Sequence, residues 1–327
     1  MSYHHALIFY RTITQVHVGC GQEVGVVDLP VIRERSTGYP YFPGSGIRGS
    51  LRDEFENPPD EALVADRKTQ SSQLFGPEDL ANLSATQEPY AGCLAVHDAR
   101  ILLFPVRSDK AVFLWVTCPI VLNRFLRDIT AFNLPFTPGV TGVESPGEKA
   151  FVGPDSYGTA ETDVLHLEEF RFVPQQNAET LRTNLNTLIG NIGRAMGISE
   201  LASQTVLIHD KAFYHFVNYA TIITQHNRLT SAKTVEGGML FSVESLPPET
   251  IFYGMIGATR QRKPDQEGET RFDNPVNTLT TLRNSLCPTV NNGVLRQSYV
   301  HFGGKESIGM GLTELTWLTP NAEVNNG

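Results

Sequence analysis

Short apolar segments of strand length, separated by long polar or proline- and glycine-rich stretches, most limit the folds that this sequence can adopt. The segments are rich in β-branched and aromatic residues, which fit a pleated sheet. We expect strands at 5–18, 93–104, 110–118, 205–209, 212–225 and 239–258, and a strand, glycine-rich loop and strand at 299–318. Ile47, Leu51 and Phe55 at helical spacing predict a helix that includes 47–55. We also expect helices at 119–132, 176–197 and 275–290. Strands broken by only a few helices predict an α+β fold with an antiparallel sheet.

The length of 327 residues is sufficient for one large domain or two small ones. We interpret residues 1–327 as a single domain with irregular insertions near 57–90 and 133–163. Residues 226–238 are polar and lie between two strand-like segments, which predicts a protruding hairpin with Arg228 and Lys233 near its tip. The 133–163 insertion is the alternative place for such a protrusion.

The composition limits the surroundings and the partners of the chain. A net charge of −9 and a pI of about 5.5 argue against a nucleic-acid-binding protein, unless a basic strip lies on an acidic body. The four cysteines are far apart in sequence and indicate neither a zinc site nor a disulfide framework. No apolar run approaches the roughly 20 residues that span a bilayer. We therefore expect a cytoplasmic protein that does not bind membranes.

Residues 44–49 match the pattern G-x-G-x-x-G. A dinucleotide-binding fold requires a buried strand before this pattern, and the two prolines just ahead of it disfavour one. A helix that begins here, with Ser45 as its N-cap, would instead expose amides of small residues such as Gly46 to an anion. Arg48 and Arg52 would share one face of that helix. The alternative is an ordinary capped helix with two surface arginines.

Two further segments carry candidate residues. Residues 303–311 contain four glycines and Lys305, which indicates either a loop that approaches a phosphate chain or a flexible hairpin turn. Asp28 lies in an apolar extended segment, where it either binds a divalent metal, acts on a ribose 2′-hydroxyl, or is simply exposed. His17 is either a proton carrier or a packing residue.

Together these segments resemble the RAMP proteins of CRISPR systems. The resemblance is strongest to the backbone subunit, the fourth named subunit, of type III-B Cmr effector complexes. It covers nearly the whole chain, and its most specific blocks are the first and the last. The matching blocks are GVVDLPVIRERSTGYPYFPGSGIRGSLR at 25–52, QLFG at 73–76, AVHDARILLFPVRS at 95–108, WVTCPIVLNRF at 115–125, ESLPPETIFYG at 244–254 and FGGKESIGMGL at 302–312.

The resemblance implies a modified RRM or ferredoxin-like palm with large insertions and a protruding β-hairpin thumb. It also implies that copies of the chain line up as a filament along one CRISPR RNA, beside other Cmr subunits. Complementary target RNA would be cut at regular intervals by a metal-dependent endoribonuclease activity, with Mg²⁺ or Mn²⁺ as cofactor. The aspartate of the GVVD segment falls on Asp28 as catalytic residue and metal ligand, and His17 is its catalytic neighbour.

The family's basic residue that grips the guide backbone falls on Arg48, and the glycine-rich loop near the end would also contact the guide. The predicted RNA-binding residues are Gly19, Gly21, Ser45, Gly46, Arg48, Arg52, Gly303, Gly304 and Lys305. Two alternatives share most of these residues. One is a non-catalytic RNA-binding scaffold of the same kind of complex. The other is a guide-processing endonuclease with metal-free, histidine-centred chemistry.

Overall fold

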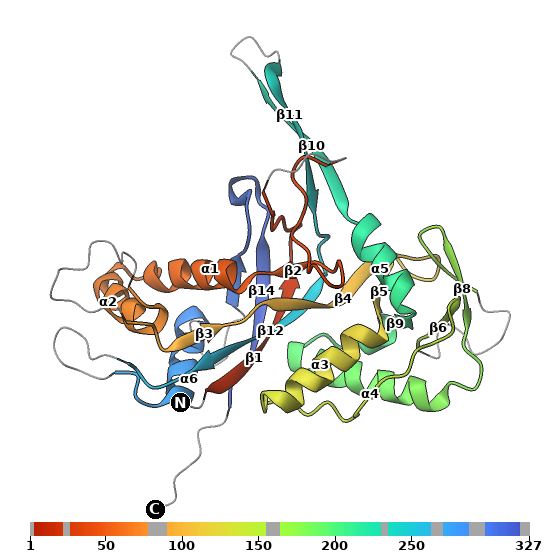
Figure 1. The fold of residues 1–327 in the computed structure, drawn as a ribbon, viewed down its shortest axis with the longest axis horizontal. Coiled ribbons are helices and arrows are strands. Elements are labelled where there is room, and N and C mark those ends of the chain that lie inside the picture. The colour runs from red at the N-terminus through yellow and green to blue at the C-terminus, as the bar shows by residue number, and fades with distance from the viewer. Residues whose placement is uncertain are drawn as a thin grey trace, which may run out of the picture.

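A large, mostly antiparallel sheet forms the body of the protein, seen in a computed structural model (Figure 1). The structure describes residues 3–21, 27–77, 90–154, 164–229, 235–262, 271–287 and 298–320. Along the sheet the strands follow the order β13-β14-β1-β12-β4-β5-β9-β6-β8-β7, with β2 beside β4 and β3 beside β12. The predicted α+β class with an antiparallel sheet is thus confirmed, whereas the interpretation as a single domain stays a prediction.

The first half of the sheet holds the centre of the molecule. Strand β1 (His4–Thr12) pairs antiparallel with β12 (Ile251–Ala258) on one side and with β14 (Leu312–Leu318) on the other. Its neighbours further out are β4 (Ala99–Arg107) and β13 (Ser298–His301). The short strands at this end are β2 (Tyr41–Phe42) and β3 (Leu94–Val96).

The second half of the sheet continues from β4 through β5 (Phe113–Thr117) and β9 (Thr205–Ile208). It ends with β6 (Ala150–Val152), β8 (Phe170–Pro174) and β7 (Leu165–Leu167). The pairs β5–β9 and β6–β8 are parallel, so the sheet is mixed at this end. The predicted strands at 110–118 and 205–209 are confirmed, whereas the one predicted at 93–104 is divided into β3 and β4.

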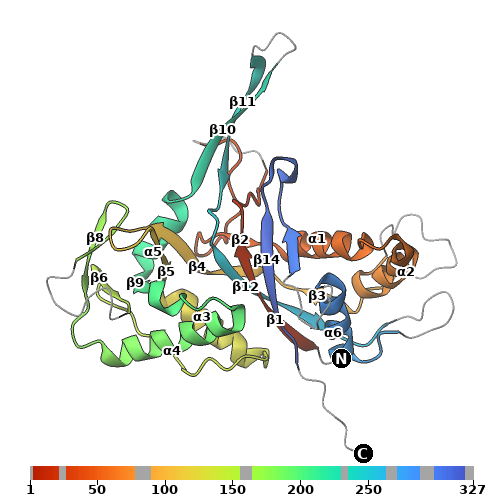
Figure 2. The ribbon, with the colours of Figure 1, turned by 180° about the vertical axis from the view of Figure 1, so that it is seen from behind.

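Two groups of helices lie at opposite ends of the molecule (Figures 1 and 2). The first group is α1 (Gly44–Glu56), α2 (Val64–Phe75) and α6 (Pro275–Leu286), and the second is α3 (Pro119–Ala131), α4 (Glu179–Met196) and α5 (Asp210–Tyr219). Short 3₁₀ turns lie at Glu61–Leu63, Ala202–Gln204 and Glu306–Ile308. Helix α1 confirms the prediction made from apolar spacing, and α3, α4 and α6 confirm the other three predicted helices. No helix in the described ranges is long and apolar enough to cross a membrane.

Three local predictions are wrong. The strand expected at 212–225 is instead α5 followed by β10, because Phe213, Phe216 and Val217 recur at helical spacing and bury one helix face. The insertion expected to be irregular contains α2, whose buried residues gather at its C-terminal end. Ser45 does not cap α1, since the helix already begins at Gly44, and the Gly44 amide donates to the Asp98 carboxylate over 2.7 Å.

This start of α1 also contradicts the dinucleotide-binding alternative. All six residues of the G-x-G-x-x-G pattern lie inside the helix, so no glycine-rich turn precedes it. The strand before it has only two residues and pairs antiparallel with β4. Among the described residues around α1 no parallel βαβ unit is formed, which the dinucleotide fold needs.

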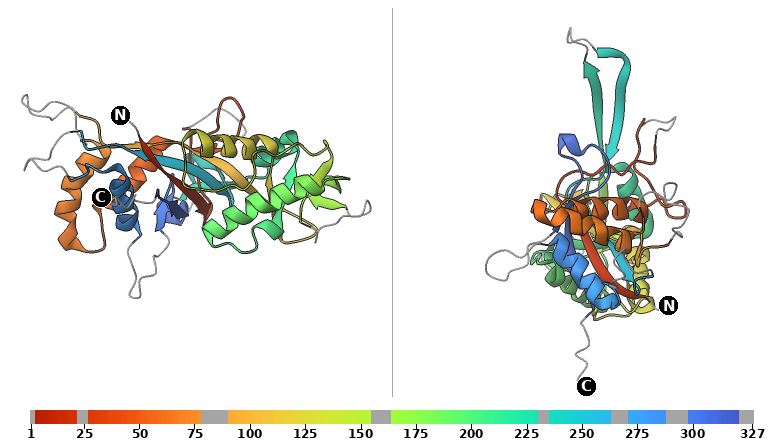
Figure 3. Two further views of the ribbon diagram at one scale, coloured as in Figure 1. Left: turned by 90° about the horizontal axis from the view of Figure 1, so that it is seen from below. Right: turned by 90° about the vertical axis from the view of Figure 1, so that its left-hand side faces the viewer.

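A separate two-stranded hairpin projects from the body, formed by β10 (Ile222–Leu229) and β11 (Val235–Ser245) (Figure 3). It begins earlier and ends later than the predicted 226–238, and the prediction of a protruding hairpin is confirmed. Arg228 lies in β10, whereas Lys233 lies outside the described residues. The alternative site, 133–163, contributes β6 to the sheet, and its residues 155–163 lie outside the described part.

The core between β1, β4 and β12 is rich in aromatic side chains. Phe42 is 1% exposed and stacks on Phe252 with 4.4 Å between ring centroids. The rings of Tyr10 and Phe302 pack against Phe42 at 6.3 and 5.7 Å. Offset aromatic pairs add stabilisation beyond the burial of their area. Phe42 therefore ties the segment before α1 to the central strands.

Phe42→Ala is expected to lower the free energy of unfolding by about 3–5 kcal/mol, because it leaves a cavity among three other rings. The exposed Val112, at 91% exposure, supplies a control: Val112→Ala is expected to change stability by less than about 0.5 kcal/mol. Urea unfolding followed by circular dichroism measures both. An equal effect of the two substitutions would contradict this packing.

Candidate active site at the base of the hairpin

The edge of β11 that faces away from β10 is covered by two segments from the start of the chain. The amide of Leu29 donates to the Ser242 carbonyl, and the Glu244 amide donates to the Leu29 carbonyl, over 3.1 and 3.0 Å. Further along, Leu246 and Val16 exchange both of their backbone hydrogen bonds. Backbone pairing thus places the segments of Asp28 and His17 along one strand edge, at the base of the projecting hairpin.

Asp28 is fixed at this edge by a single residue of β11. Its Oδ2 accepts hydrogen bonds from the Ser242 amide and hydroxyl, both at 2.8 Å, and its own amide donates to the Ser242 hydroxyl oxygen at 2.9 Å. The bond from the Ser242 amide is the main cause that lowers the pKa of Asp28, and the Ser242 hydroxyl adds to it. Asp28 is therefore an ionised carboxylate at neutral pH, and its Oδ1 accepts no hydrogen bond from the described residues.

His17 is bound to the same strand edge two residues further on. Its Nδ1 lies 2.6 Å from the carbonyl oxygen of Glu244. Because a carbonyl only accepts, Nδ1 donates in this contact, and in the tautomer that makes this bond Nε2 carries the lone pair. The side chain is 7% exposed, so it is a buried, oriented histidine.

Three of the predicted RNA-binding glycines surround His17. A Cβ at Gly19 would lie 2.7 Å from His17 Nε2, and a Cβ at Gly303 would overlap the His17 carbonyl oxygen. The Gly304 amide donates to that same carbonyl over 2.9 Å. The structure therefore brings the first and the last predicted motifs together, and these glycines have a packing role. Gly21, with φ of 105°, has open space around its Cβ position.

Glu244 and Arg33 fasten the Asp28 segment from the other side. Glu244 is 6% exposed, and its Oε2 accepts the Val31 amide at 2.9 Å while its Oε1 binds the Arg33 guanidinium. Arg33 also donates to the Val217 carbonyl at the end of α5, over 2.8 Å. Sequence reasoning missed Ser242 and Glu244. The alternation of polar and apolar residues in FSVES, which places both side chains on one strand face, is the only signal for them.

The donor set allows one kind of divalent-metal binding. Within the described ranges no group of three or more histidine, cysteine, aspartate or glutamate side chains is close enough to hold a metal ion. Mg²⁺ is often bound through one or two carboxylates, with waters and substrate phosphates as its other ligands. Asp28 Oδ1 fits the role of such a single protein ligand. A cation here would depend on RNA oxygens for the rest of its shell.

The predicted RNA-binding arginines of α1 are engaged inside the protein. Arg48 donates to the carbonyl of Phe75, and Arg52 donates to the Gly76 carbonyl at 3.2 Å and to Glu56 at 2.7 Å. These contacts satisfy carbonyls at the C-terminal end of α2. Burial lowers the pKa of Arg48, with a smaller effect from Arg52. Contact of either residue with RNA stays a prediction, as it does for the exposed Ser45 and Gly46.

The other face of the hairpin contacts the glycine-rich loop. Lys305 has a positive φ of 71°, and its Nζ lies 4.9 Å from the centroid of the Phe241 ring. The Phe241 ring stacks on His226 of the paired strand, with 5.7 Å between centroids. A cation over an aromatic face is attracted to it, so this contact holds the loop against β11. Sequence reasoning named Lys305 but not its two aromatic partners.

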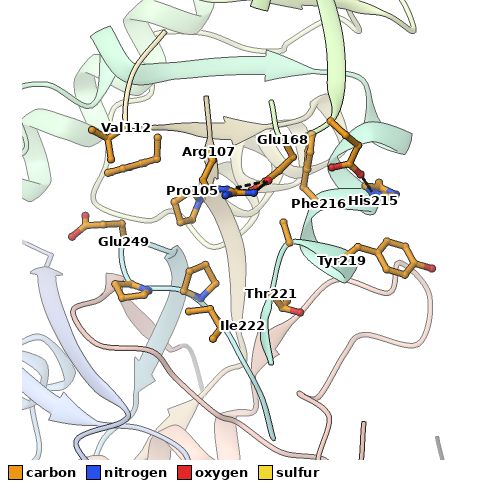
Figure 4. Close-up of a pocket in the computed structure, with 15 residues that line it drawn as sticks. Pro105, Arg107, Val112, Glu168, His215, Phe216, Tyr219, Thr221, Ile222 and Glu249 are labelled. Atoms are coloured by element: carbon orange, nitrogen blue, oxygen red, sulfur yellow. Dashed lines mark hydrogen bonds and ion pairs between the residues drawn. The ribbon is translucent and has the colours of Figure 1, made fainter. Parts of the chain in front are cut away.

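A pocket of about 620 Å³ opens on the other side of the hairpin base (Figure 4). It is mostly apolar, and its lining includes Tyr219, Ile222 and Pro247. Its charged groups are paired, since Arg107 binds Glu168 and His215 lies 3.5 Å from Glu169. None of the predicted site residues lines it, so the candidate chemistry lies outside this pocket.

The sequence profile of the RAMP superfamily matches residues 9–314. This chain belongs to the RAMP superfamily. The protein from Pyrococcus furiosus named CRISPR system Cmr endoribonuclease Cmr4 is 30% identical to it over 320 residues, which cover 95% of this chain and 94% of the relative. The resemblance predicted from the sequence is therefore confirmed.

Solved structures show the same RAMP fold. The crystal structure of oligomeric Cmr4 from Pyrococcus furiosus matches 98% of this chain and 100% of that one, with a TM-score of 0.69 at 24% identity. A chain in the cryo-EM structure of the type III-B Cmr-beta complex bound to cognate target RNA matches 97% of this chain and 98% of that one, with a TM-score of 0.65 at 20% identity. The fold of this chain is thus shared with solved Cmr structures.

Gly303→Ala is expected to destabilise this RAMP protein more than Gly309→Ala does. Both glycines have φ of 82°, so both substitutions carry a backbone cost of roughly 1 kcal/mol. Only Gly303 faces the His17 carbonyl, whereas the Cβ position of Gly309 is open, so Gly303→Ala adds a clash of about 1–3 kcal/mol. Urea unfolding measures the difference. Equal losses would show that the loop does not pack on His17 as described.

Proposed function

We propose that this chain is a repeating backbone subunit of a type III-B RNA-guided effector complex, in which it binds CRISPR RNA and cleaves complementary target RNA beside Asp28 with a divalent metal. One observation carries the proposal: an ionised carboxylate, with one oxygen that no described residue bonds, and an oriented histidine are fixed two residues apart on one strand edge at the base of a projecting hairpin. The 30% identical relative carries the name Cmr endoribonuclease, which supports the same activity here.

The residues support phosphodiester cleavage in defined roles. A divalent cation bound at Asp28 Oδ1 would neutralise charge on the reacting phosphate and polarise an attacking hydroxyl. Attack on phosphorus by a 2′-oxygen breaks the bond to the 5′-oxygen, so one proton must leave the nucleophile and one must reach the leaving group. Asp28 would act as metal ligand or as the base that takes the proton of the 2′-hydroxyl, and the lone pair on His17 Nε2 can accept that same proton. Water would supply the proton that reaches the leaving 5′-oxygen.

RNA binding by an acidic chain with net charge −9 needs only local contacts. Base pairing between guide and target reads the sequence, so the protein recognises shape and backbone. Lys305 and the glycine-rich loop lie beside the hairpin base, and the exposed start of α1 supplies amides to a phosphate. The expected partners are CRISPR RNA, target RNA, further copies of this chain and other Cmr subunits, in the cytoplasm.

One observation favours a second candidate function, a non-catalytic RNA scaffold. Of the carboxylates that the described residues bring to the site, Glu244 is bound to Arg33 and only Asp28 keeps an oxygen without a hydrogen bond from them, and these residues form no cluster of metal ligands. Incubation of the assembled complex with complementary RNA and Mg²⁺ separates the two. Evenly spaced products that disappear on chelation support the nuclease. Uncut target supports the scaffold, and cutting that persists in a chelator would support histidine-centred, metal-free chemistry.

Asp28→Asn in the assembled complex is expected to slow target cleavage by about 10²–10⁴-fold, because it removes the charge that binds metal or accepts a proton. Target binding is expected to remain, since the amide keeps the shape of the side chain. Asp273→Asn is the matched control, because Asp273 is exposed and lies outside the site. Product formation on a gel measures the rate, and cutting by Asp28→Asn at the control's rate refutes the nuclease proposal.

Arg48→Ala tests whether this arginine contacts phosphate in addition to the end of α2. Loss of one contact to single-stranded RNA reduces the slope of log affinity against log salt by about 0.7. We expect that reduction for Arg48→Ala, measured by RNA binding between low and moderate salt. An unchanged salt slope together with a lower free energy of unfolding would assign Arg48 to the helix contact alone.

A further inference from the structure

We infer that Ser242 is the positioning residue for Asp28, and that strand β11 of the hairpin thereby sets which carboxylate oxygen meets the RNA. The inference rests on the proposed function in that Asp28 is the reacting carboxylate. None of the predicted motifs includes Ser242, which lies 214 residues from Asp28 along the chain.

The hydrogen bonds between the two residues leave the Asp28 side chain little freedom. Ser242 donates both its amide and its hydroxyl proton to Oδ2, each over 2.8 Å. The hydroxyl oxygen in turn accepts the Asp28 amide at 2.9 Å, so side chain and backbone of Asp28 are held by one group. Because Oδ2 already accepts two hydrogen bonds, Oδ1 is the carboxylate oxygen that can bind a metal ion or a proton. In an aspartate that rotated freely, the two carboxylate oxygens would be equivalent and either could bind the ligand.

Ser242 acts through Asp28 because it is itself inaccessible. Its residue is 4% exposed, and its single hydroxyl proton is committed to Oδ2. Ser242 also pairs with Gln225 across the hairpin. The position of Asp28 is therefore coupled to the hairpin, and a tilt of β11 would move the carboxylate with it.

A merely structural serine would stabilise the strand edge without influencing the reaction. The pair Ser242→Thr and Ser242→Val separates these roles, because the two side chains have nearly the same shape and only threonine keeps the hydroxyl. Both substitutions are β-branched and suit a strand, so any strain from the added methyl is common to them.

The experiment uses the assembled complex with each variant and a complementary target over a range of Mg²⁺ concentrations. We expect Ser242→Val to lower the maximal cleavage rate, or to raise the Mg²⁺ concentration for half-maximal cutting, by about 10–100-fold with target binding unchanged. Ser242→Thr is expected to recover most of that loss. Equal behaviour of the two variants, whether both cut well or both fail, overturns the inference.

A second readout is independent of cleavage and of metal. Hydrogen exchange of the peptide that contains Asp28 is expected to be faster in Ser242→Val than in Ser242→Thr, because the Asp28 amide loses its acceptor. Identical exchange in both variants also counts against the inference. If Asp28→Asn cuts normally, the proposed function itself fails. If Asp28→Asn is inactive and Ser242→Val cuts like Ser242→Thr, only the positioning role of Ser242 fails.

Discussion

The site depends on the hydrogen bonds along the edge of β11 that faces away from β10. An unpaired strand edge exposes amides and carbonyls that must find partners. Here the amides of Ser242 and Glu244 donate to the Asp28 segment, and their carbonyls accept from Leu29 and from the His17 ring. The same hydrogen bonds thus cover this edge and fix the positions of Asp28 and His17. The hairpin is held to the body through that edge, so its attachment and the geometry of the site are inseparable.

Burial around this edge explains how a protein with a net charge of −9 can present a defined reactive group. The charges next to the site are internally neutralised, since Glu244 binds Arg33. Glycines at 19 and 303 bring the backbone close to His17 where a side chain would collide. Asp28 differs from these residues, because only one of its carboxylate oxygens is bonded within the described part of the chain. Its Oδ1 is therefore available to a ligand, while the rest of the Asp28 segment is held in place.

Local patterns predicted the local elements, and long-range pairing decided the rest. Helix α1 followed from apolar spacing, and the resemblance to RAMP proteins pointed to Asp28 and to His17. The aromatic residues of α5 are typical of strands, and this composition led to a strand prediction although the residues recur at helical spacing. Ser242 lies 214 residues from Asp28, and no pattern within one segment can reveal that pairing. Arg48 likewise binds the carbonyl at the end of α2, and the sequence did not predict that helix or its packing against α1.

A density map of the assembled complex with guide and uncleaved target bound tests the central claim most directly, because it measures the distance from Asp28 to the target backbone. If Asp28 Oδ1 and a phosphate oxygen share one Mg²⁺, they lie within about 4 Å of each other, since each bond to the ion is roughly 2.1 Å. The account predicts this spacing, with Ser242 still bonded to Oδ2. A target backbone that passes more than about 10 Å from every Asp28, beyond the reach of one bridging ion and its water, would contradict it.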